Sequence, residues 1–213
     1  MALVDISSNI EFIDRTLGIR SIISLFKQKN IPINNKSSLD LFAGDGSFCS
    51  YVLGENVKTI DCITYNEKDA LKIIQNIPNS NIVIGDTYKE IKNLNKTYDI
   101  IFCDNPQNIL PNGHCEYFDL LKYIPNLIEN EGYFIHNVNV LPYNYNNNSI
   151  WGKTRNKFYN LSSTSNIDLD YILKFHKDYF ENLNLKVEDI KLIPREKFND
   201  NIYLYFIYYK LKW

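Results

Sequence analysis

Residues 38–48 of this chain read Ser-Leu-Asp-Leu-Phe-Ala-Gly-Asp-Gly-Ser-Phe. The apolar run over 38–42 predicts a short buried strand, and residues 47–53 predict a helix. Gly44 and Gly46 lie between the two elements, where glycine permits a tight turn with positive φ. Such a turn brings a ligand directly against backbone N–H groups at the start of a helix. The stretch therefore predicts a binding loop.

The size and charge of the chain limit what it can be. Its 213 residues can bury one sizeable core, which indicates a single domain over residues 1–213. Hydrophobic residues make up 45% and charged residues 23%, as in ordinary globular proteins. The formal net charge of −2 disfavours tight nonspecific binding to nucleic acid, which requires a basic surface. A local basic patch at Lys153, Arg155 and Lys157 stays open.

The four cysteines are Cys49, Cys62, Cys103 and Cys115, and they form no CxxC pair and no ligand spacing with the three histidines. We therefore expect buried free thiols and no metal site. The N-terminal residues lack the basic-then-apolar pattern of a signal peptide, and no run reaches the roughly 18 uncharged residues of a membrane span. These features predict a cytoplasmic protein.

Strand and helix patterns alternate along the first two thirds of the chain. After a leading helix over 9–30, strands are expected over 38–42, 58–64, 81–86, 98–104 and 132–140, with helices over 67–75, 87–91 and 116–128. The runs at 81–86 and 98–104 have the form of buried parallel strands. This alternation predicts a doubly wound, mostly parallel sheet in a three-layer α/β/α arrangement. Ligands of such sheets bind beyond the carboxyl ends of the strands.

Residues 144–167 are rich in Asn, Ser and Thr, and they are too long and too aromatic for a plain turn. We expect a lid or acceptor loop there. Four rings near it either form an acceptor pocket or belong to the core: Tyr143, Tyr145, Trp151 and Tyr159. Residues 168–213 predict a closing helix and two strands, and the short link at 199–201 favours an antiparallel hairpin. The expected sheet then has seven strands.

Residues 38–143 resemble the cofactor-binding core of the class I S-adenosylmethionine-dependent methyltransferases in strand order and motifs, and the closing hairpin resembles the end of that fold. In the family, an acid and a G-x-G turn surround the methionine part of the cofactor. The resemblance implies that this loop binds the cofactor through Asp40, Phe42, Ala43, Gly44, Asp45 and Gly46. A dinucleotide-binding domain would need a third glycine where Cys49 stands, which disfavours a nicotinamide enzyme.

Two acids follow the next two strands. The resemblance implies that Glu67 holds the ribose hydroxyls and that Asp86, with Thr87 beside it, binds the adenine amino group. A bidentate carboxylate suits two vicinal hydroxyl donors. Each acid also has a structural alternative: Glu67 as a first-turn acid that interacts with the helix dipole, and Asp86 as a helix N-cap. Asn66 is a possible substitute for Glu67.

Asp104-Asn105-Pro106-Gln107 ends the strand at 98–104. It resembles the D/N-P-P-Y/F/W signature of methyltransferases that act on exocyclic or amide nitrogens, where the first side chain and a following carbonyl bind the target amine. The resemblance implies catalytic roles for Asp104, Asn105 and Pro106, and a cofactor contact for Asp104. Asn105 replaces the first proline and Gln107 the aromatic ring, which disfavours a flipped nucleobase. Turn formation is the alternative, because Asn-Pro favours turns.

His136 is a candidate general base for an oxygen acceptor, or else a hydrogen-bonded structural histidine. The resemblance makes the chain a methyltransferase with S-adenosylmethionine as the methyl donor. We expect a small molecule, a sugar or a peptide as acceptor, because the net charge and Gln107 disfavour nucleic acid. The alternatives are an amino group of RNA or DNA, and a module that binds the cofactor without catalysis. No membrane partner is expected.

Overall fold

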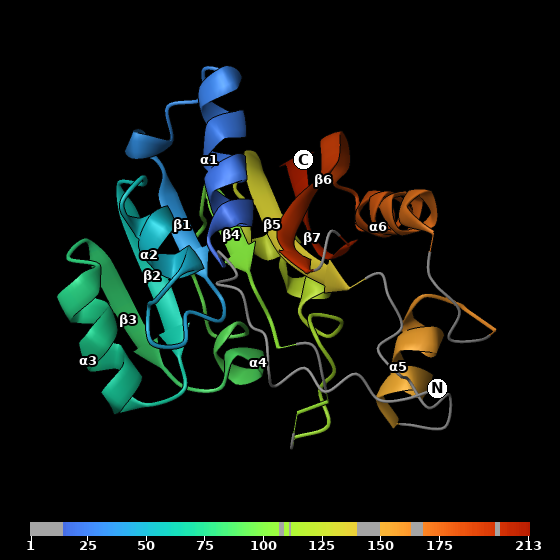
Figure 1. Ribbon diagram of the computed structural model, residues 1–213, viewed down its shortest axis with the longest axis horizontal. Coiled ribbons are helices and arrows are strands. Elements are labelled where there is room, and N and C mark those ends of the chain that lie inside the picture. Colours follow the sequence, from blue (N-terminus) through green and yellow to red (C-terminus); the bar gives the residue numbers. More distant parts are fainter. Residues whose placement is uncertain (1–14, 107–108, 111, 140–149, 163–167, 199–200) are drawn as a thin grey trace.

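Five parallel strands and an antiparallel hairpin form a seven-stranded sheet in the computed structural model, which describes residues 15–106, 109–110, 112–139, 150–162, 168–198 and 201–213. The order across the sheet is β3-β2-β1-β4-β5-β7-β6, from left to right in Figure 1. The strands are β1 (Ser37–Asp40), β2 (Thr59–Thr64), β3 (Ser80–Ile84), β4 (Ile100–Cys103), β5 (Glu131–Asn139), β6 (Lys186–Phe198) and β7 (Asn201–Lys212). The expected sheet and its terminal hairpin are confirmed.

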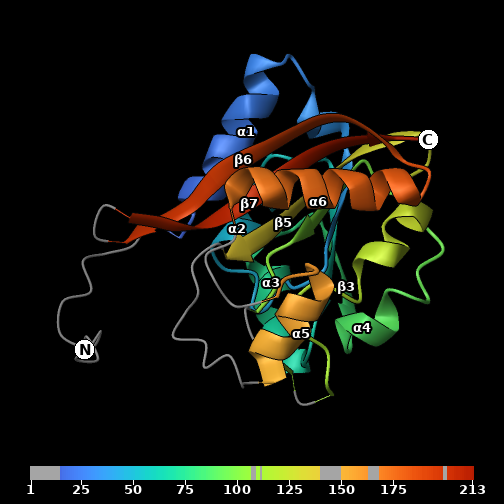
Figure 2. The ribbon, with the colours of Figure 1, turned by 90° about the vertical axis from the view of Figure 1, so that its right-hand side faces the viewer.

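Helices cover both faces of the sheet. The helices are α1 (Leu17–Gln28), α2 (Cys49–Gly54), α3 (Glu67–Asn76), α4 (Thr87–Glu90), α5 (Ile150–Phe158) and α6 (Leu169–Asn182). Residues of α1, α2 and α3 share one hydrophobic core, whereas residues of α4 and α6 share the other, against which α5 also packs. Figure 2 shows α6 running across the β6–β7 hairpin. The three-layer arrangement is therefore confirmed.

The central strand β4 explains why two separate cores form. Ile100 and Phe102 belong to the core under α1, α2 and α3, and Ile101 and Cys103 belong to the other core. All four side chains are fully buried. A strand that is covered on both faces has no polar side to its pattern, which is why this stretch is continuously apolar.

The parallel register brings the carboxyl ends of β1 to β4 to the same edge of the sheet. Asp40, the last residue of β1, pairs with Cys62 of β2 and Phe102 of β4. Thr64, the last residue of β2, pairs with Ile84 of β3. The loops that follow these four strands therefore meet at this edge, where a doubly wound sheet binds its ligands.

Residues 116–128 do not form the expected α-helix. They contain two short 3-10 turns, η2 (Leu121–Tyr123) and η3 (Pro125–Leu127). Pro125 lacks an N–H and its ring would clash with the carbonyl of Leu121 in an α-helix. Glu116 has a φ of 48°, which is also incompatible with a helix. The apolar spacing misled the prediction because the tighter turns bury the same side chains: Leu120, Leu121, Ile124, Leu127 and Ile128.

The structure differs from the expectation in three other segments. The leading helix begins at Leu17 and ends at Gln28, and residues 9–14 lie outside the described residues. β3 is an edge strand whose Ile84 is 50% exposed, so it is not buried on both faces. Residues 144–167 contain α5, while Tyr143, Tyr145 and Gln107 lie outside the described part of the chain.

The four cysteines are free and buried, as the sequence predicts. Burial raises the pKa of each thiol, so all four are protonated and unreactive at neutral pH. Within the described ranges, each helix is too short or too polar to cross a membrane.

Candidate active site

Two cavities meet at the carboxyl ends of the parallel strands. The larger has a volume of about 850 Å³ and the smaller about 190 Å³. Both are lined by Phe42, Gly44, Asp104 and Arg195. The sequence-predicted residues that line one or both cavities are Phe42, Ala43, Gly44, Asp45, Asp86, Thr87, Asp104, Asn105 and Pro106. Four other predicted residues line neither cavity: Asp40, Gly46, Glu67 and His136.

The glycine loop after β1 forms a wall of both cavities. Gly44 and Gly46 have φ angles of 55° and 78°, which favour glycine. A Cβ atom on Gly46 would lie 2.8 Å from Cγ1 of Ile73, so this glycine allows α3 to pack closely. A Cβ atom on Gly44 would meet nothing within 4 Å. The Thr64 hydroxyl donates to the Gly44 carbonyl at 2.6 Å and ties the loop to the end of β2.

Asp40 lies behind this wall and is completely buried. Its Oδ1 accepts a hydrogen bond from the Phe42 amide at 3.1 Å, whereas Oδ2 has no hydrogen-bond partner among the described residues. Burial raises the pKa of Asp40 to about 7, against the opposing effects of Ser50 and the Phe42 amide, and the nearby Asp104 adds to the rise. An orphaned carboxyl oxygen behind a cavity wall is costly in a folded protein.

Asp86 caps a helix and also lines the larger cavity. It is the N-cap of α4, with Oδ1 accepting from the Tyr88 amide at 3.1 Å. Its Oδ2 accepts from Asn112 at 2.9 Å, and the side chain also lines the larger cavity. Thr87 is held by its hydroxyl, which donates to the Leu41 carbonyl at 2.5 Å.

Asp104 is fixed by two side chains that sequence analysis missed. Its Oδ1 accepts from Nε of Arg195 at 2.9 Å and from Nδ2 of Asn137 at 2.8 Å, and its Oδ2 accepts from Nη2 of Arg195 at 2.8 Å. Asn137 Nδ2 also donates to the Asn105 carbonyl at 2.9 Å, and its Oδ1 accepts from the Asn105 amide at 3.1 Å. Asn137 belongs to β5 and Arg195 to β6.

Comparison with protein-family models and with curated proteins gives no match. Solved structures do match. TYW2 from M. jannaschii, in complex with AdoMet, aligns with a TM-score of 0.53 and 13% identity over 90% of this chain and 75% of that chain. The candidate RNA methyltransferase PH1948 from Pyrococcus horikoshii gives 0.50 and 16% over 91% and 82%, and the candidate methyltransferase yhhF from Escherichia coli gives 0.51 and 15% over 91% and 87%. This chain has the class I methyltransferase fold.

Within this methyltransferase fold, the end of β2 presents Thr64 and Tyr65 to the larger cavity in place of Glu67. Glu67 is the exposed first residue of α3, and Asn66 caps that helix by accepting from the Asp69 amide at 2.9 Å. The position of Glu67 matches its structural alternative, a first-turn acid. Thr64 is the last residue of β2 that pairs with β3, so the residues at the strand end, and not Glu67, reach the cavity.

His136 points away from both cavities of the methyltransferase fold. It is fully buried, with Nε2 2.9 Å from the Tyr209 hydroxyl and Nδ1 3.1 Å from the Asn137 carbonyl. Burial lowers its pKa to about 3, so the ring is neutral at pH 7. This is the structural histidine of the two alternatives. Successive strand residues face opposite sides, so it is the neighbouring Asn137 that reaches Asp104.

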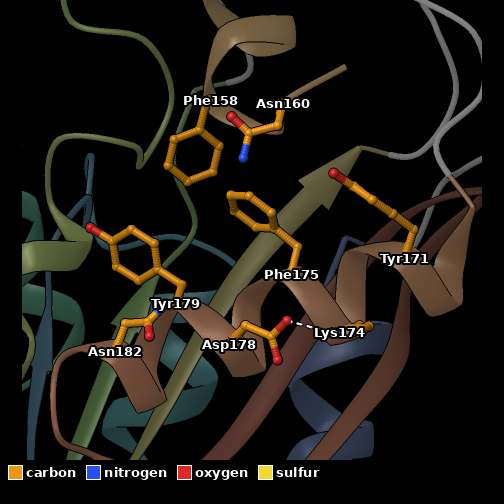
Figure 3. Close-up of a pocket in the computed structure, with 8 residues that line it drawn as sticks. All are labelled: Phe158, Asn160, Tyr171, Lys174, Phe175, Asp178, Tyr179 and Asn182. Atoms are coloured by element: carbon orange, nitrogen blue, oxygen red, sulfur yellow. Dashed lines mark hydrogen bonds and ion pairs between the residues drawn. The ribbon is translucent and has the colours of Figure 1, made fainter. Parts of the chain in front are cut away.

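A separate cavity of about 530 Å³ lies between the end of α5 and α6. Figure 3 shows the rings of Phe158 and Phe175 close together, with Asn160 above them and the Lys174–Asp178 ion pair on α6. It shares no lining residue with the two cavities at the strand ends.

Of the four rings near the long loop, the two described ones, Trp151 and Tyr159, pack against the core, which matches the second alternative. The Trp151 indole donates to Glu116 at 2.7 Å, and Tyr159 is fully buried. Over the described residues there is also no group of three or more His, Cys, Asp or Glu side chains placed to hold a metal ion.

Proposed function

We propose that this chain is a methyltransferase that binds S-adenosylmethionine across the two cavities and transfers its methyl group to an acceptor held at Asp104. One observation carries the proposal: the loops after four adjacent parallel strands contribute Gly44, Tyr65, Asp86 and Asp104 to the wall of one cavity. TYW2, a structure with the same fold, is in complex with AdoMet.

The residues present fit such a cofactor. The larger cavity has the size of small-molecule sites, ~300–1,000 Å³, and the open space at Gly44 lets a ligand approach the backbone. We assign Asp86 to the adenine amino group and the Thr64–Tyr65 backbone and side chains to the ribose. The Gly44–Asp45 turn suits an amino-acid moiety, because both residues line the smaller cavity.

The cofactor supplies an electrophilic methyl carbon on a sulfonium, so the chain has mainly to align the acceptor and exclude water. Asp104 Oδ2 and the Asn105 carbonyl accept N–H hydrogen bonds from the acceptor nitrogen and thereby orient its lone pair. Phe42 and Pro106 line the larger cavity beside them and restrict the entry of water. His136 takes no part, because it is buried in the core.

Two observations favour different acceptors. The net charge of −2 favours a small molecule, a sugar or a peptide. The fold of PH1948, a candidate RNA methyltransferase, favours an amino group of RNA as the second candidate. Tritiated methyl transfer into a fractionated lysate separates the two, since the label enters either the small-molecule and peptide fractions or the RNA fraction. Binding without transfer in any fraction identifies a noncatalytic cofactor-binding module.

Calorimetry with S-adenosylhomocysteine, the demethylated product, tests donor binding. Gly44→Ala introduces a methyl group into the cavity at a positive φ and should weaken binding about tenfold. Gly113→Ala is the matched control, because Gly113 also has a positive φ of 84° and open space but lines neither cavity. Absence of binding by the unmodified protein would overturn the proposed function.

A further inference from the structure

We propose that Arg195 and Asn137 are positioning residues that hold Asp104 so that one oxygen, Oδ2, is presented to an acceptor N–H group. The inference rests on the proposed function and narrows the acceptor to a group that carries a proton on its reacting atom, such as an amino or amide nitrogen. We call the hydrogen bonds of Arg195 and Asn137 to Asp104 the Asp104 clamp. It joins three strands, since Asp104 follows β4, Asn137 is in β5 and Arg195 is in β6.

Arg195 binds the carboxylate with two nitrogens. Nε lies 2.9 Å from Oδ1 and 3.2 Å from Oδ2 of Asp104, and Nη2 lies 2.8 Å from Oδ2. The two side chains are only 16% and 15% exposed. A bidentate, partly buried pair of this kind fixes the plane of the carboxylate, which a lysine with its single ammonium group cannot do.

Asn137 completes the clamp. Its Nδ2 donates to Oδ1 of Asp104 at 2.8 Å, so Oδ1 accepts one hydrogen bond from each of two residues. A carboxylate oxygen offers about two lone pairs, and Oδ1 is therefore fully used. Oδ2 accepts from Nη2 of Arg195 at 2.8 Å and shares the single Nε proton at 3.2 Å, and this longest of the four contacts is the one that an acceptor N–H group can replace.

The backbone around Arg195 is also tightly placed. Gly18 of α1 packs so closely that a Cβ atom there would lie 2.7 Å from Cα of Arg195. The guanidinium lies 5.8 Å from the centre of the Phe206 ring, which supports it from the neighbouring strand β7. Arg195 is thus held from the helix side and the strand side, as a positioning role requires.

The arrangement selects for acceptors that carry a proton on the reacting atom. An amino or amide nitrogen or a neutral hydroxyl donates to Oδ2, whereas a deprotonated oxygen would face a carboxylate of the same charge. Both cavities are lined by Asp104 and Arg195, so the selection operates at their junction.

The test compares two ligands that differ at the transfer position and needs no knowledge of the natural acceptor. Sinefungin is an analogue of the donor in which a carbon bearing an amino group replaces the methylated sulfonium, and S-adenosylhomocysteine lacks that group. Calorimetry gives the ratio of their affinities for the unmodified protein, Arg195→Met, Arg195→Lys and the control Arg20→Gln. Arg20 is exposed on α1, and its Nε donates to the Thr16 hydroxyl at 2.8 Å.

The clamp predicts that Arg195→Met lowers the sinefungin preference about tenfold, while the affinity for S-adenosylhomocysteine changes less than about twofold. Arg195→Lys should lose part of the preference and Arg20→Gln none. Circular dichroism shows whether each variant folds. If Arg195→Met does not fold, Arg195→Lys provides the test.

Other outcomes overturn the inference. An unchanged or increased preference for sinefungin in both Arg195 variants means that Arg195 does not position Asp104 for an amine. Loss of S-adenosylhomocysteine binding only in the Arg195 variants assigns the arginine to the donor itself. Failure of the unmodified protein to bind either ligand removes the proposed function as well, and the two failures are thereby distinguishable.

Discussion

Gly18 of α1 lies directly against Arg195 of β6: a Cβ atom on residue 18 would be 2.7 Å from Cα of Arg195 and 2.8 Å from the ring of Phe206. Neither the strand backbone nor the buried ring can move away cheaply. The helix that precedes the glycine loop therefore sets the position of a strand that begins more than half a chain later.

Gly18→Val should destabilise the protein by about 1–3 kcal/mol, because overpacking forces α1 away from β6. Urea unfolding followed by circular dichroism measures the change. Lys27→Ala, an exposed change in the last turn of the same helix, should alter the free energy of unfolding by less than about 0.5 kcal/mol. Equal stabilities for the two variants would contradict the close packing.

Arg155→Met should cost about 3–5 kcal/mol, because it leaves Glu116 as an unpaired buried acid. Glu116 is fully buried, its Oε1 lies 3.7 Å from Nε of Arg155, and burial raises its pKa although Arg155 opposes the rise. Adding Glu116→Gln removes the stranded charge and should restore much of the loss. A double-mutant cycle by urea unfolding measures the coupling, and additive losses would show that the pair does not interact.

His136 should make the protein less stable as the pH falls. Burial lowers its pKa from 6.5 to about 3, so between these values the unfolded chain binds a proton that the folded chain does not. Stability from this residue is complete above pH 6.5 and falls by up to about 1.4 kcal/mol per pH unit below it. Between pH 5 and 6.5, His136→Gln should lower the slope of unfolding free energy against pH by up to about 1.4 kcal/mol per pH unit relative to the unmodified protein. An unaltered slope would show that the ring is protonated in the folded state.

Asp40 should act with the opposite sign. Its pKa rises from 3.8 to about 7 on folding, so between these values the folded chain binds the extra proton, and stability decreases as the pH rises. Asp40→Asn removes this loss. The change in unfolding free energy that the substitution causes should therefore be more stabilising at pH 8 than at pH 4, by up to about 4 kcal/mol. Urea unfolding at both pH values tests it. In the unmodified protein, Asp40 offsets the effect of His136 on the pH dependence of unfolding free energy between pH 4 and 6.5. This dependence should therefore be steeper in Asp40→Asn.

Patterns along the chain were sufficient for the sheet and for the loops at its edge. The apolar runs before Asp86 and Asp104 each mark a parallel strand that ends one or two residues before the acid, and Asp40 is the last residue of β1 although it is completely buried. The failures have local causes. Pro125 breaks a segment with helical spacing, and Glu67 lies in the helix after β2 because the paired strand already ends at Thr64.

The hydrogen bonds that hold Asp104 could not be predicted from the sequence. Arg195 is 91 residues away in sequence, in a closing strand, and nothing in the sequence indicates its contact with Asp104. His136 and Asn137 are neighbours with opposite orientations, and the register that decides which of them faces the site is set by pairing with β4 and β7. Contacts between distant residues and the pairing register of strands produce no periodic pattern in the sequence.

The separation between Asp104 and Arg195 also orders events in time as the chain is made. At about 5–20 residues per second, the 91 residues between them take roughly 5–20 s to synthesise. During that interval, β1 to β4 and the glycine loop already exist, but the carboxylate has no arginine. A nascent chain of this kind can order the ends of its parallel strands first, and both cavities are complete only when the final hairpin supplies Arg195.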